Sequence, residues 1–410
     1  MKYDVIIIGG GASGLCASIL IKRKRPELSV AILESQNRVL KKLLVTGNGR
    51  CNITNKNILV DAYHGENKEF CKYALEKFGY DFTETFFCSI GIPFTTSENG
   101  KVYPQSLQAS SIVDALRITA EELGVMIFCE KTAKGIYKLP VGYEINTQND
   151  KYFGKKIIIA AGGVSGGKSL IADKEQYNLL SDLGHKTIKP YPSLVQLKTE
   201  LNGIKALNGL KQICNVTAKV NGKKVRSEVG ELLFTKYGIS GPPVLQISRS
   251  FAKTDKGTVE INLLPEYSFN NVYDLLILRR KLLKNRTAEY FFTGVFQKMI
   301  GYTLLKMSQV SLNDNIGDIS DKKLKNLAEN ITCFSLKVTG NTGFDNAQVT
   351  AGGFSTNEFN EKSMESLKHK DIYAIGEVLD IDGDCGGFNL QWAWSSAAVA
   401  AEDICNDTYK

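Results

Sequence analysis

The chain has 410 residues, of which 43% are apolar and 23% are charged. This balance is typical of globular proteins, excludes a disordered chain, and at this length predicts two or three domains. The net charge of +8 is compatible with anionic ligands, but an ordinary lysine-rich surface is the simpler interpretation. Because no basic run with interleaved aromatic residues stands out, we expect a small-molecule substrate and no nucleic-acid partner.

Cysteine and histidine usage indicates reduced thiols and no metal centre. The nine cysteines include no C-x-x-C pair, and the chain has only three histidines. These features are typical of a cytoplasmic protein without disulfides or a metal site. We also expect no membrane span, because no stretch of about 18 apolar residues is present.

The N-terminal residues predict a βαβ unit. Residues 3–8 form an apolar run typical of a strand buried on both faces, 12–24 predict a helix, and 29–33 predict a second strand. Further helices are predicted at 68–78, 82–89 and 110–123, and further strands at 125–128, 136–143 and 155–161.

The pattern changes at about residue 191. Short alternating segments with Asn-Gly and Lys-Gly turns predict antiparallel β-structure there. Helices are then predicted at 270–283, 287–307 and 321–330, followed by a strand at 372–375 and a helix at about 390–405. The simplest architecture is a nucleotide-binding domain of residues 1–190 and 335–410, an inserted antiparallel β domain at 191–268 and a helical subdomain at 269–334.

A dinucleotide-binding fingerprint joins the first strand to the first helix. Gly9, Gly11 and Gly14 form the pattern G-x-G-x-x-G, and Glu34 ends the second strand 20 residues past Gly14. The glycines permit a tight turn, close approach of a pyrophosphate and close helix packing, while the acid accepts hydrogen bonds from ribose hydroxyls. The N-terminal position, with more sheet segments arriving later in the chain, favours FAD over NAD.

Several long motifs resemble a known family. Residues 40–55 read LKKLLVTGNGRCNITN, similar to the G-R-K-L-L-x-T-G-x-G-R-C-N-x-T-N stretch of bacterial NAD(P)/FAD-dependent oxidoreductases. That family includes bile-acid-inducible 3-dehydro-bile-acid reductases and aminoacetone oxidases. Further similar segments lie in the same order at 232–242, 349–353, 376–380 and 386–393, so the resemblance covers nearly the whole chain.

The resemblance implies a fold and a cofactor site. The fold is α/β, with a Rossmann-like FAD-binding domain built from N- and C-terminal segments, an inserted β-barrel-like domain and a small helical domain. Together with the fingerprint, the resemblance predicts that FAD is bound by Gly9, Gly11, Ala12, Ser13, Gly14, Glu34, Lys42, Thr46, Gly49, Arg50, Cys51, Asn52, Ala133, Ala161, Gly162, Gly376, Glu377, Gly387, Asn389 and Leu390.

The resemblance also implies the reaction. The leading hypothesis is an NAD(P)H-linked reductase that passes hydride through flavin N5 to an electron-poor C=C of an enone, such as a steroid or bile acid. No second G-x-G-x-x-G is evident, so NAD(P)H is expected as a transient donor. The alternatives are an oxidase of a small amine or aminoketone that uses O₂, and a non-enzymatic protein with a structural or sensory FAD.

Three features compete with or depart from this interpretation. Lys236 stands where the family usually has His, so no catalytic acid or base is named, and Lys236 and Tyr237 are equally consistent with scaffolding. Residues 162–169 fit a Walker A loop, which makes an ATPase a minor alternative. Cys51 and Cys385 are both predicted near the flavin, where inert thiols are expected more than a redox dithiol.

Overall fold

The computed structural model describes residues 1–97, 99–166, 174–201, 203–252, 254 and 257–407. The chain divides into two compact units, which we describe separately. Unit 1 comprises Met1–Pro192 and Ala347–Lys410, and unit 2 comprises Ser193–Asn346. Unit 1 therefore combines the two ends of the chain, and unit 2 is a single continuous insertion.

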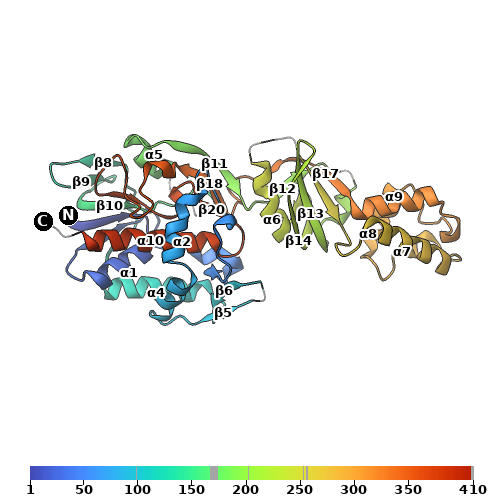
Figure 1. The fold of residues 1–410 in the computed structure, drawn as a ribbon, viewed down its shortest axis with the longest axis horizontal. Helices are drawn as coiled ribbons and strands as arrows, with labels where there is room; N and C mark the ends of the chain where they lie inside the picture. Colours follow the sequence, from blue (N-terminus) through green and yellow to red (C-terminus); the bar gives the residue numbers. More distant parts are fainter. Residues whose placement is uncertain (98, 167–173, 202, 253, 255–256, 408–410) are drawn as a thin grey trace. The chain divides into compact units, whose positions relative to one another are not determined.

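A mixed sheet forms the centre of unit 1 (Figure 1). Strands β7, β2, β1, β10 and β19 run parallel, whereas β9 and β8 extend the sheet antiparallel. One edge of β10 is shared, because its first half pairs with β9 and its second half with β19. The strand bounds are β1 Lys2–Ile8, β2 Val30–Leu33, β7 Met126–Phe128, β8 Gly135–Lys138, β9 Tyr143–Asn146, β10 Lys151–Ile159 and β19 Ile372–Ala374.

Helices from both ends of the chain pack together against this sheet. Helix α1 lies along α10, the C-terminal helix, and α4 also contacts α1 (Figure 1). Val5, Ile6, Ile7 and Ile8 of β1 are buried, so both faces of this strand are covered, and most of α10 is buried as well. The helix bounds in unit 1 are α1 Ala12–Lys24, α2 Lys72–Lys77, α3 Tyr80–Cys88, α4 Ala109–Glu122, α5 Lys174–Asp182 and α10 Phe388–Asn406.

Short strands hold the connecting loops of unit 1 in place. They form a three-stranded sheet of β3, β6 and β5 and the two-stranded pairs β20–β4 and β11–β18. Their bounds are β3 Thr54–Asn55, β4 Tyr63–His64, β5 Phe94–Thr96, β6 Lys101–Pro104, β11 Thr187–Ser193, β18 Val349–Phe354 and β20 Asp382–Gly383. Short 3-10 helices lie at Leu43–Gly49, Val60–Ala62, Lys68–Cys71, Thr356–Glu358 and Gly376–Val378.

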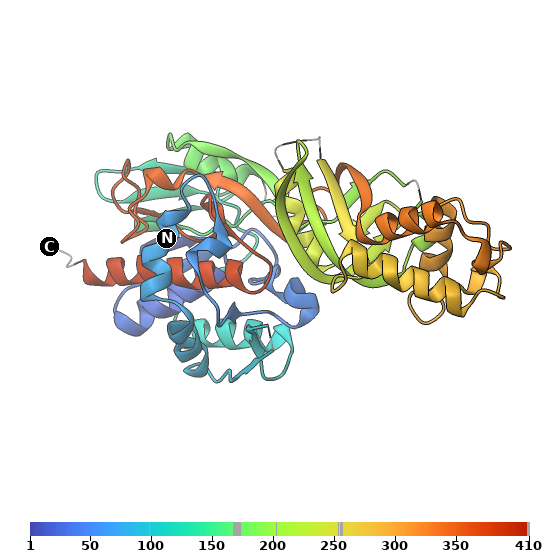
Figure 2. The same ribbon diagram turned by 45° about the vertical axis from the view of Figure 1, so that its right-hand side comes forward.

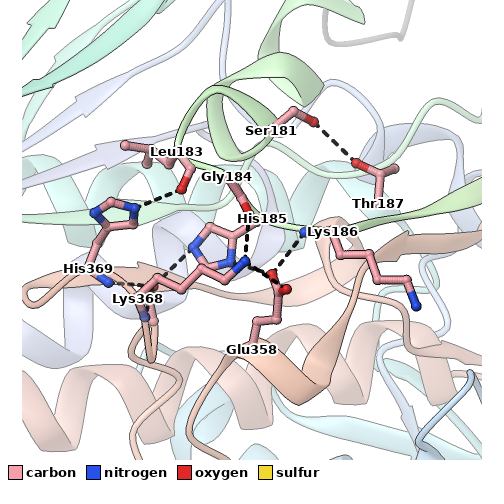
Figure 3. A network of polar contacts seen from close by, with 10 residues as sticks. Ser181, Leu183, Gly184, His185, Lys186, Thr187, Glu358, Lys368 and His369 are labelled. Carbon is pink, nitrogen blue, oxygen red and sulfur yellow. Dashed lines mark hydrogen bonds and ion pairs between the residues drawn. The ribbon is translucent and has the colours of Figure 1, made fainter.

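A buried histidine network ties the segment between α5 and β11 to the C-terminal segment of unit 1 (Figure 3). His185 Nδ1 lies 3.0 Å from a Glu358 carboxylate oxygen, and its Nε2 lies 3.0 Å from the Ser366 hydroxyl. The ring also stacks on Phe359. The hydrogen-bonded series Ser366, His185 and Glu358 resembles the catalytic triad of a hydrolase. However, Ser366 is buried, and its oxygen accepts the backbone N–H groups of residues 368 and 369. The three residues therefore stabilise the fold and do not form a catalytic triad.

Unit 2 is built around a closed six-stranded antiparallel barrel in the order β12-β15-β14-β13-β16-β17 (Figure 2). Closure leaves no free edge, because β17 returns after the helical segment to pair with both β16 and β12. The bounds are β12 Leu197–Thr199, β13 Lys211–Val220, β14 Lys223–Thr235, β15 Gly238–Ser240, β16 Gly257–Asn262 and β17 Phe334–Asn341.

Helices of unit 2 lie mainly between β16 and β17. Helix α7 packs on α9, and α8 also contacts α9. Helix α6 lies beside the barrel. The helix bounds are α6 Pro242–Ser248, α7 Phe269–Leu282, α8 Lys298–Met307 and α9 Asp321–Thr332. Short 3-10 helices lie at Lys205–Leu207, Arg249–Phe251, Ala288–Tyr290 and Ile316–Asp318.

Two predicted elements were wrong in detail. The helix predicted at 287–307 is a 3-10 turn followed by α8, because Gly294 adopts a left-handed φ of +80° that no continuous helix contains. The strand predicted at 136–143 is the hairpin of β8 and β9, which turns at Gly142 with φ +73°. The prediction therefore found β-structure at β8 but missed the turn and all of β9 except Tyr143.

Candidate cofactor site

The glycine fingerprint lies in a tightly packed turn. A Cβ on Gly9 would lie 2.3 Å from the Ala160 carbonyl oxygen, and one on Gly14 would lie 2.1 Å from the Gly9 oxygen. By contrast, a Cβ on Gly11 would meet no atom within 4 Å. Gly11 is also the N-cap of α1, which has no side-chain cap and no acidic residue in its first turn, where Ala12 and Ser13 lie. This helix end suits an anion such as a pyrophosphate.

Glu34 holds the fingerprint loop from the end of β2. One carboxylate oxygen accepts the Gly10 N–H at 2.7 Å, and the other accepts the Gln36 N–H at 2.7 Å. The oxygen that bonds Gly10 keeps a further lone pair, whereas the other oxygen also accepts the Ser35 hydroxyl at 3.2 Å. The carboxylate can therefore still accept from one ribose hydroxyl. The buried Ala133 follows in a neighbouring segment, which is anchored by the Lys131 N–H on the Glu34 backbone oxygen.

The motif at 40–55 forms an irregular loop with an unpartnered polar atom. Gly47, Asn48 and Cys51 all have left-handed φ values of 56–57°, so the backbone turns sharply there. The Asn52 side-chain oxygen is buried and has no hydrogen-bond partner within the described residues. A buried amide oxygen without a donor is costly, so this atom marks a place where a ligand donor fits.

The other predicted residues of this loop differ in their surroundings. Arg50 is exposed, and its guanidinium lies 5.4 Å above the Tyr103 ring. Thr46 donates its hydroxyl to the Leu43 oxygen and accepts the Cys51 N–H on its own carbonyl. Gly49 has open space around a Cβ, as Gly11 does. Thr46 therefore shapes the loop itself.

An ion pair joins this loop to the C-terminal segment. The Lys42 ammonium lies 2.7 Å from a Glu377 oxygen and 2.8 Å from the Ser165 hydroxyl. Glu377 also accepts from Ser165 and from the Thr350 N–H. Burial alone would raise the pKa of Glu377, but the Lys42 charge and these hydrogen bonds outweigh it and hold the pKa below its ordinary value. Glu377 is therefore a carboxylate at neutral pH.

The carboxyl ends of β10 and β19 meet at this ion pair. Ala161 and Gly162 follow β10, Gly376 follows β19, and the two strands are parallel neighbours. A Cβ on Gly162 would meet no atom within 4 Å. Ligands in doubly wound folds bind outside this same edge of the sheet.

Helix α10 organises the surrounding loops. Its N-cap is Gly387, with φ +97° and no side-chain cap, and a Cβ there would lie 2.3 Å from the Thr54 oxygen. The Asn389 side chain bonds both the N–H and the oxygen of Gly383, so it closes a turn next to the helix. Leu390, also predicted at the cofactor, lies half-buried in the first turn.

Sequence reasoning missed the residues that fix these loops to α10. The Trp392 indole N–H donates to the Gly376 oxygen at 3.0 Å, and the Gly376 N–H donates to the Ser396 hydroxyl at 3.0 Å. The buried Gln391 binds Thr54 and Thr83. A glutamine at a wholly buried helix position is the signal that could have found this contact, since such amides require partners.

The surroundings of Cys51 and Cys385 do not favour a reactive thiolate. Burial raises the pKa of the Cys51 thiol to about 12 and also raises that of Cys385. Because the thiolate is the reactive form, neither environment activates a redox dithiol. Residues 167–169 of the Walker-like motif lie outside the described residues.

Lys236 and Tyr237 form the turn between β14 and β15 in unit 2. The Tyr237 carbonyl accepts the Thr199 N–H, which contributes to barrel closure. This backbone role agrees with scaffolding.

The predicted residues of unit 1 fit FAD chemically. They combine an uncapped helix N-terminus, three glycines with open Cβ positions, an acid at the end of the second strand and the unpartnered oxygen of Asn52. Such a set suits a pyrophosphate, a ribose and a heterocycle with N–H donors. The assignment of each residue to a part of the cofactor stays a prediction.

The fold and this site define an FAD-dependent oxidoreductase of the Rossmann type. A family model described as the HI0933-like protein Rossmann domain matches residues 3–403. The chain belongs to this family, which confirms the α/β fold and the family resemblance expected from the sequence.

Curated relatives cover nearly the whole chain. A 3-dehydro-bile acid delta(4,6)-reductase of Clostridium scindens is 35% identical over 96% of this chain and 97% of its own length. A ribosomal RNA dihydrouridine synthase of Haemophilus influenzae is 31% identical over 97% of this chain and 98% of its own length. The second name leaves the expectation of no nucleic-acid partner open.

Solved structures share the fold. A 3-ketosteroid-delta4-(5alpha)-dehydrogenase from Rhodococcus jostii aligns with a TM-score of 0.51 at 13% identity, over 99% of this chain and 97% of that one. Within the described part of the chain, no helix is long and apolar enough to span a membrane. The same residues contain no group of three or more His, Cys, Asp or Glu side chains arranged to hold a metal ion.

Proposed function

We propose that this chain reduces a C=C bond conjugated to a carbonyl group, with a steroid- or bile-acid-like enone as the leading substrate class. The observation that carries the proposal is the carboxyl edge of the parallel strands in unit 1, where the uncapped Gly11 follows β1 and Glu377, paired with Lys42, follows β19. The unpartnered Asn52 oxygen of the 40–55 loop offers a further acceptor for FAD. The name of the Clostridium scindens relative supports the substrate class.

The chain's own residues would bind and orient the cofactor. The α1 N-terminus would hold the pyrophosphate, Glu34 would accept from a ribose hydroxyl, and the Asn52 oxygen would accept an N–H of the ring system. FAD, when bound, supplies the hydride chemistry. The Lys42 ammonium keeps the Glu377 carboxylate ionised next to the site. The ion pair thus joins the 40–55 loop to the segment after β19 and adds no net charge there. NAD(P)H is proposed as the transient electron donor.

Anaerobic mixing tests this function. The purified protein is mixed with NADH or NADPH while the oxidised flavin band near about 450 nm is followed, and 4-androstene-3,17-dione is then added. We expect bleaching by one nicotinamide and recovery of the band when the enone is added. A flavin that is bleached by aminoacetone and not by either nicotinamide would instead establish the oxidase alternative. A purified protein that neither carries nor takes up FAD would contradict the proposal altogether.

A second candidate substrate is a uracil ring in RNA. Dihydrouridine forms when the C5=C6 bond of uracil, which is conjugated to a carbonyl, is reduced, so both relatives' names describe the same bond type. The distribution of charge favours this candidate. Unit 2 contains 22 Lys and Arg against 13 Asp and Glu, whereas unit 1 contains 29 against 30. The whole surplus of positive charge thus belongs to the inserted unit, and such a surplus is typical of RNA-binding modules.

A further inference from the structure

The positive charge of unit 2 includes a dense basic segment at the end of α7. Residues 279–286 read RRKLLKNR, with five basic residues and no acid in eight positions. Sequence reasoning passed over this run because it lacks aromatic residues. Lys281, Lys284 and Arg286 are exposed, and in the described part of the chain none of the three side chains has an ion-pair partner.

The two remaining arginines of the segment serve the fold. Arg279 donates to the backbone oxygens of Phe291 and Thr293, and Arg280 donates to the Ile319 oxygen and pairs with Asp321 at 2.7 Å. Arg279 therefore anchors the segment to the chain before α8, and Arg280 anchors it to the start of α9. The exposed cations of the segment are presented from a fixed backbone, which lowers the entropy lost when a ligand binds.

A surface hollow lies beside these cations. Its polar lining is Arg280, Lys281, Lys284, Asn285, Asn315 and Asp318. The lining thus contains three cations and two amides but only one carboxylate. The Gly317 N–H donates to the Lys284 oxygen, which joins the two segments that line the hollow. A concave lining of ammonium, guanidinium and amide donors is suited to phosphate oxygens.

We propose that this α7 basic face, defined as Arg280, Lys281, Lys284 and Arg286 with the adjoining hollow, binds the phosphate backbone of a folded RNA. The inference rests on the second candidate function for the identity of the polyanion. Its physical basis is charge complementarity between the unpaired cations and successive phosphates, whose binding releases condensed counterions. The name of the Haemophilus influenzae relative, a ribosomal RNA dihydrouridine synthase, favours RNA over an anionic lipid surface as the polyanion. The exposed Leu278 and Leu282 nonetheless make an anionic membrane the alternative to test.

The test compares two triple variants of the full-length holoenzyme. Lys281→Gln/Lys284→Gln/Arg286→Gln removes the exposed cations, and Lys2→Gln/Lys138→Gln/Lys189→Gln removes the same charge from exposed positions of unit 1. Binding of a fluorescent RNA stem-loop is measured by anisotropy at several salt concentrations. We expect the α7 variant to bind at least about tenfold more weakly, with a salt slope reduced by about 2–3, and the control to match the wild type.

Three outcomes would overturn the inference: no RNA binding by the wild type, equal weakening in both variants, or preferential binding to phosphatidylserine vesicles over RNA. Reduction of 4-androstene-3,17-dione by the same preparations separates this result from the proposed function. The α7 variant should retain that activity, because none of its substitutions lies in unit 1. If no preparation reduced the enone while the wild type bound RNA through this face, the result would count against the leading substrate class and not against this inference.

Discussion

At the residue scale, the environment of each polar group determines its chemistry more than its type does. Glu377 stays ionised because Lys42 and neighbouring hydrogen bonds outweigh its burial. For Cys51 burial outweighs a hydrogen bond with Thr46, so the pKa of its thiol is raised. The Asn389 side-chain amide is bonded to Gly383, so the predicted contact of this residue with FAD is left to its backbone and stays a prediction. Such environments cannot be recognised in the local sequence, because a partner can be distant in the chain. Lys42 and Glu377, for example, are 335 positions apart.

Cys51→Ala should leave flavin-dependent turnover within about twofold of the wild type. Burial raises the pKa of this thiol to about 12, so it is protonated at neutral pH and cannot act as a redox nucleophile. Thiol labelling of the native protein provides a second measurement, in which the exposed Cys88 and Cys333 should react before Cys51. A severalfold loss of turnover with full FAD content would show that the thiol takes part in the reaction.

His185→Gln should reduce the dependence of stability on pH. Burial lowers the pKa of His185 below its ordinary 6.5, so the unfolded chain binds this proton more readily than the folded one. The wild type should therefore lose stability as pH falls below about 6.5, until the folded pKa is passed. Urea midpoints at about pH 7.5 and about pH 5.5 measure the effect, and the difference between them should be smaller in the variant. Equal differences in the two proteins would contradict this assignment.

At the element scale, α1 and α10 connect the ends of the chain. The fingerprint turn packs against Ala160 after β10, and Trp392 of α10 anchors Gly376 after β19. The sequence predicted α1 exactly and α10 to within two residues at its start, because both have long buried faces and glycine N-caps. It did not predict that they lie side by side, since the contact joins residues nearly 400 positions apart.

Two glycine substitutions on α1 should have different effects. Gly14→Ala places a Cβ 2.1 Å from the Gly9 oxygen, which forces the helix away from the turn and should cost about 1–3 kcal/mol of stability even without FAD. Gly11→Ala meets no atom within 4 Å, so it should leave the stability of the apoprotein unchanged and weaken FAD binding. Chemical denaturation of the apoproteins and FAD titration measure the two effects. If Gly11→Ala bound FAD as tightly as the wild type, the pyrophosphate would not lie at this turn.

At the scale of the whole molecule, the two units have separate hydrophobic cores. The core of unit 1 surrounds the sheet and α10, and that of unit 2 fills the barrel and extends between α7, α8 and α9. The sequence predicted an inserted β-rich and helical segment from its change of pattern. It assigned 335 onward to the nucleotide-binding part, whereas β17 at Phe334–Asn341 closes the barrel in the structure.

FAD should stabilise unit 1 without stabilising unit 2. Both tryptophans of the chain, Trp392 and Trp394, are buried in α10, so tryptophan fluorescence reports on unit 1, whereas far-ultraviolet circular dichroism reports on both units. At a free FAD concentration of 100 times Kd, the free energy of unfolding of unit 1, followed by fluorescence, should rise by about 2.7 kcal/mol. The unfolding transition of unit 2, seen only by circular dichroism, should not shift. A single transition that shifts as a whole would show that the two units unfold together.

The sequence by itself determined the class of this protein. Gly9, Gly11, Gly14 and Glu34 lie within one local βαβ unit, whose geometry follows from buried apolar runs and glycine spacing. The tertiary structure alone decided which distant groups meet: Lys42 with Glu377, Gln391 with Thr54, and β17 with β12. The physical reason is that strand pairing and buried hydrogen bonds depend on the position of a partner in space, which a local pattern of residues does not encode.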